Sequence, residues 1–255
     1  MQRRSWREED CTMVPNTPPV GPAVQNKLLA AIPARERERV LRGLTPVFLS
    51  FGKTLYESGA QLNQVYFPTS AIVSLSYVMT DGTSAEIAVV GNEGVVGVAL
   101  FMGEASTPGR AVVQSPGWAY SLTGALLKQE FTRAGAMLQL LLRYTQALLA
   151  QMTQTVVCNR DHSIDQQLCR WLLLRLDRME TDELTMAHEA VADMVGVRRE
   201  DVIAAFAKLR SSGLLHYSQA HITVVNRAGL EARACECYGV VKRESERLFY
   251  SAITH

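Results

Sequence analysis

The sequence predicts an α+β protein in which an N-terminal β jelly roll is followed by a long helix and by short helices that end in a β-hairpin. Three changes in the hydrophobic pattern predict this order. Apolar and polar residues alternate between residues 47 and 122, apolar residues recur every three or four positions after Gly124, and two short strand-like runs follow Gly213. These patterns are typical of strands, helices and a hairpin, respectively.

Composition and charge exclude several classes of protein. The chain has 255 residues, of which 47% are hydrophobic and 20% charged, enough for one large domain or two medium ones. The net charge of +1 means that any site for a polyanion must be local. The longest uncharged run, residues 58–80, contains polar residues and proline, so we expect no membrane helix. Because the charged N-terminus lacks the apolar core of a secretory signal, we expect a cytoplasmic protein.

The chain divides into five predicted segments. They are a flexible tail rich in charge and proline (1–24), a β-barrel (25–124), a long helix (125–157), a helical region ending in a hairpin (158–227) and a C-terminal helical tail (228–255).

The barrel prediction rests on alternation and on turns. Val73, Leu75 and Tyr77 alternate with serines, and the dipeptide Asp81-Gly82 between two such runs favours a hairpin turn. Further glycine and proline turn markers recur at roughly 8- to 12-residue spacing, which is typical of an antiparallel barrel or jelly roll.

The long helix carries a stripe with the three-four alternation of a coiled-coil seam. Its members are Leu138, Leu142, Thr145, Leu149, Met152 and Val156. One interpretation is that this face packs lengthwise on the barrel. The stripe is longer than one small barrel can cover, which favours the other interpretation, a homodimer.

Residues 188–207 fit a helix-turn-helix. Ala192 supplies the small residue where two helices cross, and Gly196 supplies the turn. Arg198 and Arg199 open the second helix, which then buries Val202, Ala205, Phe206 and Leu209. The residues left on or near its other side are Glu200, Ile203, Ala204, Ala207 and Lys208.

A helix of this kind fits the major groove of DNA, where the residues at its N-terminal end reach the base edges. Arginine reads guanine and glutamate accepts from cytosine, so Arg199 and Glu200 are candidate base contacts. Arg198 is a candidate phosphate contact. In the alternative interpretation these charges are only a solvated face.

Two strand-like runs follow the helix at once, at residues 214–217 and 221–225, and predict a wing. Gln219 at its tip and His221 are candidate contacts to the DNA backbone. Alternatively, His216 and His221 only occupy a surface hairpin.

The order of barrel, long helix and helix-turn-helix with a wing resembles the Crp/Fnr family of bacterial transcription regulators. The most specific part of the resemblance is the motif VGVRREDVIAAFAKLRSSGLLHY (195–217). The resemblance covers about residues 25–226. It implies a cyclic-nucleotide-binding-type barrel, a dimerisation helix and a winged helix. It also implies a homodimer that reads a two-fold symmetric operator in double-stranded DNA and contacts RNA polymerase. The effector, the operator and the direction of regulation stay unknown.

Departures from the family pattern predict a degenerate effector domain that does not bind cyclic AMP. Cyclic-nucleotide binders of this family carry a Gly-Glu pair about ten residues before an arginine. Here Gly103-Glu104 lies six residues before Arg110, and Glu93-Gly94 inverts the order. Arg110 with Ala111 could still hold a phosphate, which keeps a cyclic-nucleotide-responsive regulator open.

We expect neither a cofactor nor a metal. The family's iron-sulfur members use several N-terminal cysteines, whereas this chain has only Cys11 there, and a haem would need an axial ligand that the barrel lacks. Cys235 and Cys237, spaced i, i+2, would point to different faces of a helix, so metal or redox use would need an extended turn there. We expect them to pack as ordinary side chains, with a surface thiol or a metal or redox site as the alternatives. Cys158 and Cys169 are interpreted as small buried hydrophobes.

Two other classes of protein share parts of this pattern. A metal-dependent cupin would share the jelly roll but needs histidines on the barrel strands, whereas all five histidines follow the barrel; they are His162, His188, His216, His221 and His255. The sequence also lacks the common hydrolase, nucleotide and zinc-protease motifs, so no enzyme is predicted. A winged-helix adaptor that docks a protein stays open, because residues 158–213 hold eight Lys and Arg against ten Asp and Glu.

Overall fold

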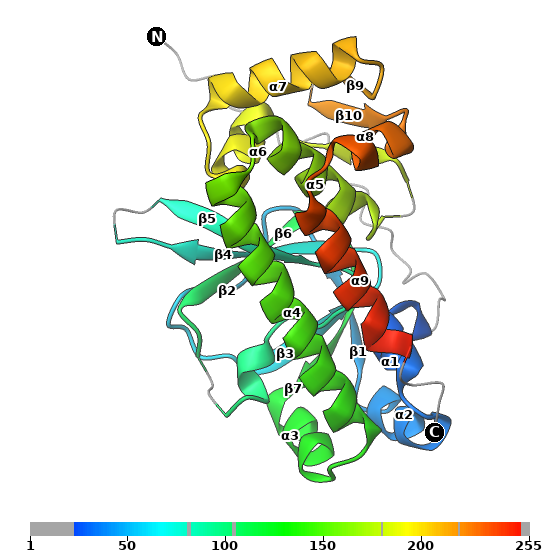
Figure 1. Cartoon of the computed structure of the whole chain (residues 1–255). Helices are drawn as coiled ribbons and strands as arrows, with labels where there is room; N and C mark the ends of the chain where they lie inside the picture. The colour runs from blue at the N-terminus through cyan, green and yellow to red at the C-terminus, as the bar shows by residue number, and fades with distance from the viewer. Residues whose placement is uncertain (1–22, 81–82, 104–105, 180, 219, 251–255) are drawn as a thin grey trace.

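The computed structural model describes residues 23–80, 83–103, 106–179, 181–218 and 220–250 (Figure 1). Some of the expectations from the sequence concern residues outside these ranges. They are the tail up to residue 22 with Cys11, the Asp81-Gly82 turn, Glu104, Gln219 and His255.

A short helical lead-in precedes the barrel. It consists of a 3-10 turn (Ala23–Gln25), α1 (Lys27–Ala31) and α2 (Ala34–Leu41). Asn26, which is fully buried, accepts from the backbone N–H of Leu29 and so caps α1. Its amide donates to the carbonyls of Pro68 and Gly94, both at 2.9 Å, and this anchors the lead-in to the barrel.

The N-terminal domain is an antiparallel β jelly roll, as predicted. Its strands are β1 (Thr45–Leu49), β2 (Thr54–Tyr56), β3 (Gln64–Pro68), β4 (Ile72–Val78), β5 (Ser84–Val90), β6 (Gly109–Ser115) and β7 (Gly117–Thr123). They form one sheet in the order β1-β7-β3 and another in the order β2-β6-β4-β5. Alternate side chains of both sheets fill the space between them, including Phe67, Val73, Val113 and Leu122.

The predicted single helix over residues 125–157 is wrong in its bounds. It is two helices, α3 (Gly124–Thr132) and α4 (Ala136–Asp161), separated by a turn in which Ala134 has a φ of 52°. Glu36 of α2 causes the new start, because its carboxylate accepts from the backbone N–H groups of Ala136 and Met137 at 3.3 and 3.4 Å. That carboxylate occupies the space that a Cβ on Gly135 would need.

The C-terminal half follows in the order α5 (Ile164–Leu176), β8 (Glu183–Thr185), α6 (His188–Val195), α7 (Arg199–Ser211), β9 (Leu215–Ser218), β10 (His221–Val224), α8 (Arg227–Arg233) and α9 (Glu236–Tyr250). The three strands form a sheet in the order β8-β10-β9. The sequence missed β8, because three residues are too few to show a periodic pattern.

The C-terminal tail does not stand apart from the two domains. Helix α9 lies alongside α4 (Figure 1), with Leu248 in the core of the barrel and Tyr238 and Val241 in the core of the C-terminal half. The segment therefore bridges the two cores, and the α+β class predicted from the sequence is confirmed.

Candidate nucleic-acid interface

The turn between α6 and α7 has the predicted chemistry. Gly196 has a φ of 78°, a left-handed conformation that favours glycine, and its N–H donates to the carbonyl of Ala192 at 2.8 Å. Ala192 itself is buried between the helices. The pair of helices is therefore held at a fixed crossing by two small residues.

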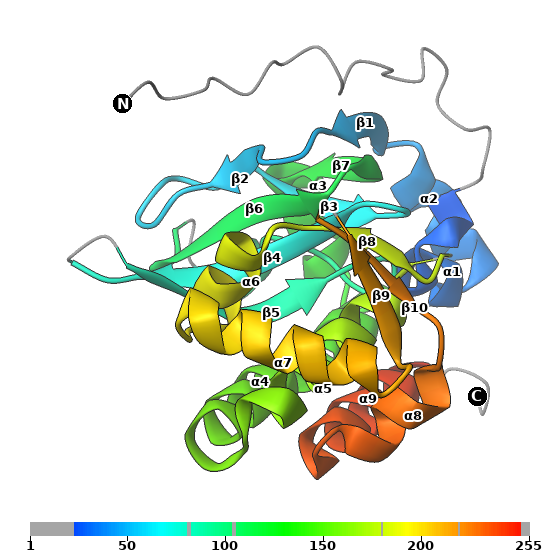
Figure 2. The same ribbon diagram turned by 90° about the horizontal axis from the view of Figure 1, so that it is seen from above.

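Helix α7 has one buried and one open face. Val202, Ala205, Phe206 and Leu209 are buried, as predicted. The opposite face exposes Glu200, Ile203, Ala204, Ala207 and Lys208. The helix forms the upper edge of the molecule in Figure 1 and lies towards the viewer in Figure 2. The barrel therefore does not lie in the path of a DNA duplex that approaches this edge.

An aromatic cluster fixes the base of α7. The rings of His188 and Tyr217 are 4.1 Å apart between centroids, and both lie within 5.4 Å of Phe206. The cluster joins α6, α7 and β9. Burial, and then the charge of Arg199, lowers the pKa of His188, so the ring is neutral at neutral pH.

The two arginines at the start of α7, which are candidate DNA contacts, are exposed and form ion pairs with acidic side chains of the same chain. Arg198, whose side chain is 80% exposed, donates from Nε and Nη2 to both carboxylate oxygens of Asp201 at 2.9 and 3.1 Å. Arg199 pairs with Glu189 of α6 at 2.8 Å. Exposed pairs of this kind contribute little stability. Both guanidinium groups can therefore exchange a carboxylate for a phosphate or a base at low cost.

The remaining predicted contacts lie on the flanks. Lys208 pairs with Asp165 of α5 at 3.1 Å and so leans away from the start of α7. In the wing, His221 is exposed, and its Nδ1 lies 3.1 Å from the hydroxyl of Thr185 on β8. Gln219 lies outside the described residues.

Helix α4 carries the predicted stripe on an open face. Leu142, Leu149 and Val156 are 48%, 51% and 66% exposed, while Leu138, Thr145 and Met152 are half-buried. The opposite face packs on the barrel and on α9 through buried residues that include Leu141, Tyr144 and Leu148. The helix therefore packs lengthwise on its own chain and still presents an apolar stripe at seven-residue spacing.

Two family models match separate parts of the chain. Residues 46–133 match the cyclic nucleotide-binding domain, and residues 166–233 match the Crp-like helix-turn-helix domain. Together they cover both domains of the fold, in the order that the resemblance implied.

This chain belongs to the Crp/Fnr family of transcription regulators.

Solved structures of this family share the fold. FixK2 from Bradyrhizobium japonicum superposes with a TM-score of 0.64 at 17% identity, over 75% of this chain and 98% of that one. The global regulator CLP of Xanthomonas campestris, described as responsive to c-di-GMP, gives 0.62 at 18% identity, over 75% and 99%. TTHB099 of Thermus thermophilus gives 0.61 at 19% identity, over 74% and 96%. At these identities the likeness establishes the fold alone. None of the curated protein sequences matches the chain.

The cyclic nucleotide-binding domain of this Crp/Fnr chain does not bring its two candidate effector residues to one place. Arg110 and Ala111 are neighbours on β6, so their side chains point to opposite faces. Ala111 is fully buried between the sheets, whereas Arg110 points outwards, pairs with Glu57 at 3.2 Å and donates to the hydroxyl of Thr54.

Arg110 instead faces a groove of about 230 Å³ between the outer face of the larger sheet and α6. Glu86 and Asp193 line the same groove. Glu86 is already paired with Arg175 at 2.6 Å, whereas the carboxylate of Asp193 makes the groove less favourable for a phosphate, because like charges repel.

Four metal-ligating side chains meet at a place that the sequence did not predict. Cys158 and His162 at the end of α4 lie beside Cys235 and Cys237 at the start of α9. The expectation that Cys235 and Cys237 point to different faces of a helix is wrong. Cys235 precedes the helix and follows Ala234, whose backbone is extended, which is the turn that a shared site requires. Cys169, by contrast, is buried as a small apolar residue.

In the described part of the chain, no helix is both long and apolar enough to span a membrane.

Proposed function

We propose that this Crp/Fnr protein is a homodimer that binds a two-fold symmetric operator in double-stranded DNA through α7 of each protomer, without catalytic activity and in the cytoplasm. The observation that carries the proposal is the start of α7, where Arg198, Arg199 and Glu200 are exposed on a helix whose other face is buried. The domain division follows from the same proposal, with residues 25–124 as effector-type barrel and residues 158–227 as DNA-binding domain.

Within this proposal the contacts have distinct roles. Arg199 and Glu200 read base edges, because residues at the N-terminal end of a recognition helix reach furthest into the major groove. Arg198, Lys208 and the wing residues Gln219 and His221 contact the backbone and fix the register. The acid partners of both arginines keep these groups oriented while no DNA is bound.

Self-association uses the α4 stripe. Leu142, Leu149 and Val156 occupy one position of successive heptads, and Leu138, Thr145 and Met152 occupy the other. Exposed leucines at this spacing support a coiled-coil seam with the α4 of a second copy, because burial of that apolar surface is favourable.

The effector-type barrel is proposed to be degenerate. Its space between the sheets is filled by side chains, and Arg110 points out of it towards carboxylates. The family implies contact with RNA polymerase, whereas the signal that regulates this chain is left open.

The experiment that tests the proposal is selection of bound duplexes from a random-sequence library by the full-length protein. We expect enriched sequences with two inverted half-sites whose centres lie about 10–10.5 bp, or a multiple of this spacing, apart. The affinity should fall steeply as salt concentration rises, because phosphate contacts release counterions. Enrichment of no sequence, or of a site without symmetry, would contradict the proposal.

A second candidate function is a winged-helix adaptor that docks a protein. The pairing of Arg198 and Arg199 with acids on their own surface favours it, because these residues then present no net positive charge. An adaptor would bind no duplex DNA at any salt concentration, so the same selection separates the two functions.

A further inference from the structure

We propose that Cys158, His162, Cys235 and Cys237 form a binding site for one tetrahedral transition-metal ion of the Zn²⁺ class. The site is separate from α7 and from the effector-type barrel. It does not depend on the proposed function, since a metal can bind here whether or not the protein binds DNA.

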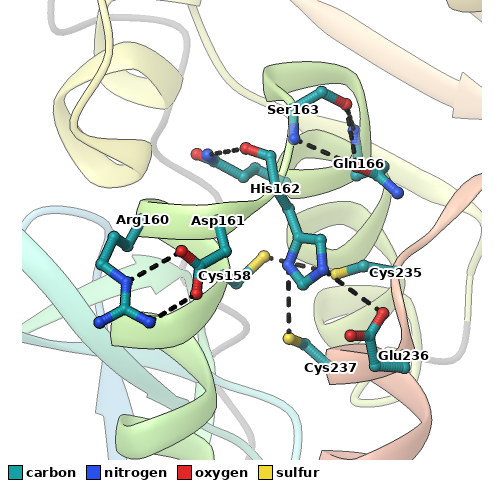
Figure 3. Close-up of polar contacts among 10 residues, drawn as sticks. Cys158, Arg160, Asp161, His162, Ser163, Gln166, Cys235, Glu236 and Cys237 are labelled. Carbon is teal, nitrogen blue, oxygen red and sulfur yellow. Dashed lines mark hydrogen bonds and ion pairs between the residues drawn. The ribbon is translucent and has the colours of Figure 1, made fainter.

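The geometry already matches a small tetrahedral cage. The four ligand atoms lie within 4.8 Å of one another. Sγ of Cys158 is 3.5 Å from Sγ of Cys235, and Sγ of Cys237 is 3.6 Å from Nδ1 of His162 (Figure 3). Around zinc, the usual Zn–S and Zn–N bond lengths place neighbouring ligands of a tetrahedron about 3.6–3.8 Å apart. An ion therefore needs only small side-chain movements to enter.

The positions arise from two local arrangements. Cys158 and His162 are four residues apart at the end of α4, so they share one face of the helix. Cys235 and Cys237 lie on either side of Glu236, where the extended backbone between α8 and α9 turns into the helix. The two pairs meet because α9 runs alongside α4.

The surroundings supply what a metal-bound histidine usually has. Nε2 of His162 faces Oε2 of Glu236 at 3.4 Å, so the ring nitrogen that does not face the thiols has a carboxylate partner (Figure 3). A carboxylate in this place orients the imidazole and fixes its tautomer. Arg170 is buried nearby and donates to Thr155, one turn before Cys158. Its positive charge would offset the single negative charge that three thiolates and a divalent cation leave.

The donor set decides the class of ion. Three sulfur ligands and one imidazole suit Zn²⁺ and exclude Mg²⁺ and Ca²⁺, which prefer oxygen. The three cysteines are buried, and the His162 side chain is 14% exposed. Four protein ligands leave no open position for substrate, so the ion would be structural rather than catalytic.

The site would connect three parts of the chain. It joins the end of α4 to the start of α9 next to Ser163, which begins α5 and the helix-turn-helix domain. A bound ion would therefore fix the DNA-binding domain relative to α4. This consequence, unlike the site itself, rests on the proposed function.

The test uses the full-length protein, reduced and stripped of metal, and titrated with Zn²⁺ alone. After gel filtration we expect one zinc per chain in the wild type and in the controls Cys11→Ala and Cys169→Ala, which remove thiols outside the cluster. Cys158→Ala, Cys237→Ala and His162→Gln should lose stoichiometric zinc. Glu236→Gln should retain the site with an affinity reduced about 10- to 100-fold.

Cobalt gives a reading on the wild type that does not depend on any variant folding. Co²⁺ in the site should show the visible bands of a tetrahedral ion and thiolate charge-transfer bands of three sulfur ligands. Zinc should also raise the melting temperature of the wild type, because a ligand bound only by the native state stabilises it.

Three outcomes would overturn the proposal. They are the absence of zinc from the reduced wild type, zinc binding that Cys237→Ala and His162→Gln leave unchanged, and an octahedral cobalt spectrum. A Cys158–Cys235 disulfide in the aerobically purified protein, with no zinc taken up after reduction, would assign the cluster to redox chemistry instead. DNA affinity is measured separately with and without zinc, so failure of DNA binding leaves the metal result intact.

Discussion

Nη2 of Arg175 donates to Oε2 of Glu86 at 2.6 Å, and this bond joins α5 of the DNA-binding domain to β5 of the barrel. Both side chains are buried, at 2% and 9% exposure. The guanidinium also lies 3.8 Å over the ring of Trp171 and contacts the sulfur of Met194 on α6. Burial lowers the pKa of Arg175, and the charge of Glu86 opposes that effect. The domain interface thus depends on a buried charge with one close acidic partner.

Glu86→Ala should destabilise the protein by about 3–5 kcal/mol, because it leaves the buried guanidinium of Arg175 without its carboxylate. The free energy of unfolding in urea measures this. The control is Glu57→Ala, which breaks the more exposed pair with Arg110 and should cost about 0–1 kcal/mol. If both variants lose the same free energy of unfolding, the Arg175–Glu86 pair does not stabilise the interface more than an exposed pair does.

Leu149→Asp should convert a dimer into monomers, because the carboxylate would be buried without a partner along the α4 seam. Sedimentation velocity measures the change in mass. Phe51→Asp is the control, since it replaces another exposed apolar side chain that lies off α4. A dimer that survives Leu149→Asp would remove the stripe from the interface.

Arg199→Ala should weaken operator binding by about 1–3 kcal/mol and relax preference at one base pair of each half-site. Fluorescence anisotropy with the selected operator and with its single-base variants provides the measurement. Arg247→Ala on α9 removes an equally charged, exposed side chain far from α7 and should leave binding unchanged. If Arg199→Ala leaves the base preference unchanged, Arg199 does not contact a base edge.

Acidification should destabilise the native protein through His188. Its pKa is lowered in the folded state, so the unfolded chain binds the proton first as the pH falls below the ordinary value of 6.5. The native state then loses stability until the pH passes the folded pKa. Urea unfolding at pH 7 and at lower pH measures the free energy of unfolding. Its decrease on acidification should be smaller in His188→Gln than in the wild type. A nuclear magnetic resonance titration that places the folded pKa of His188 above 6.5 would contradict the sign.

Cyclic AMP and cyclic GMP should leave the melting temperature unchanged. A ligand that binds only the native state must raise it, whereas here the space between the sheets is filled and Arg110 faces outwards. Thermal unfolding with each nucleotide provides the measurement. A rise that Arg110→Ala abolishes would make the barrel a working nucleotide site.

Much of the fold was predictable because it depends on short-range periodicity. The inward face of α7, the turn at Gly196 and the stripe on α4 each follow from the spacing of apolar and small residues within one or two elements. The division between α3 and α4 was not predictable in this way, because Glu36 from a distant helix sets it.

The sequence by itself determined the order of the domains, the two faces of α7 and the exposed groups at its start, since local backbone geometry fixes which neighbours share a face. Only the tertiary structure decided the partners of those groups. It paired Arg199 with Glu189 and Arg175 with Glu86, turned Arg110 away from the space between the sheets and brought Cys158 to Cys235, 77 positions away. The physical reason is that contacts across such separations depend on how whole elements pack, and no local pattern records that packing.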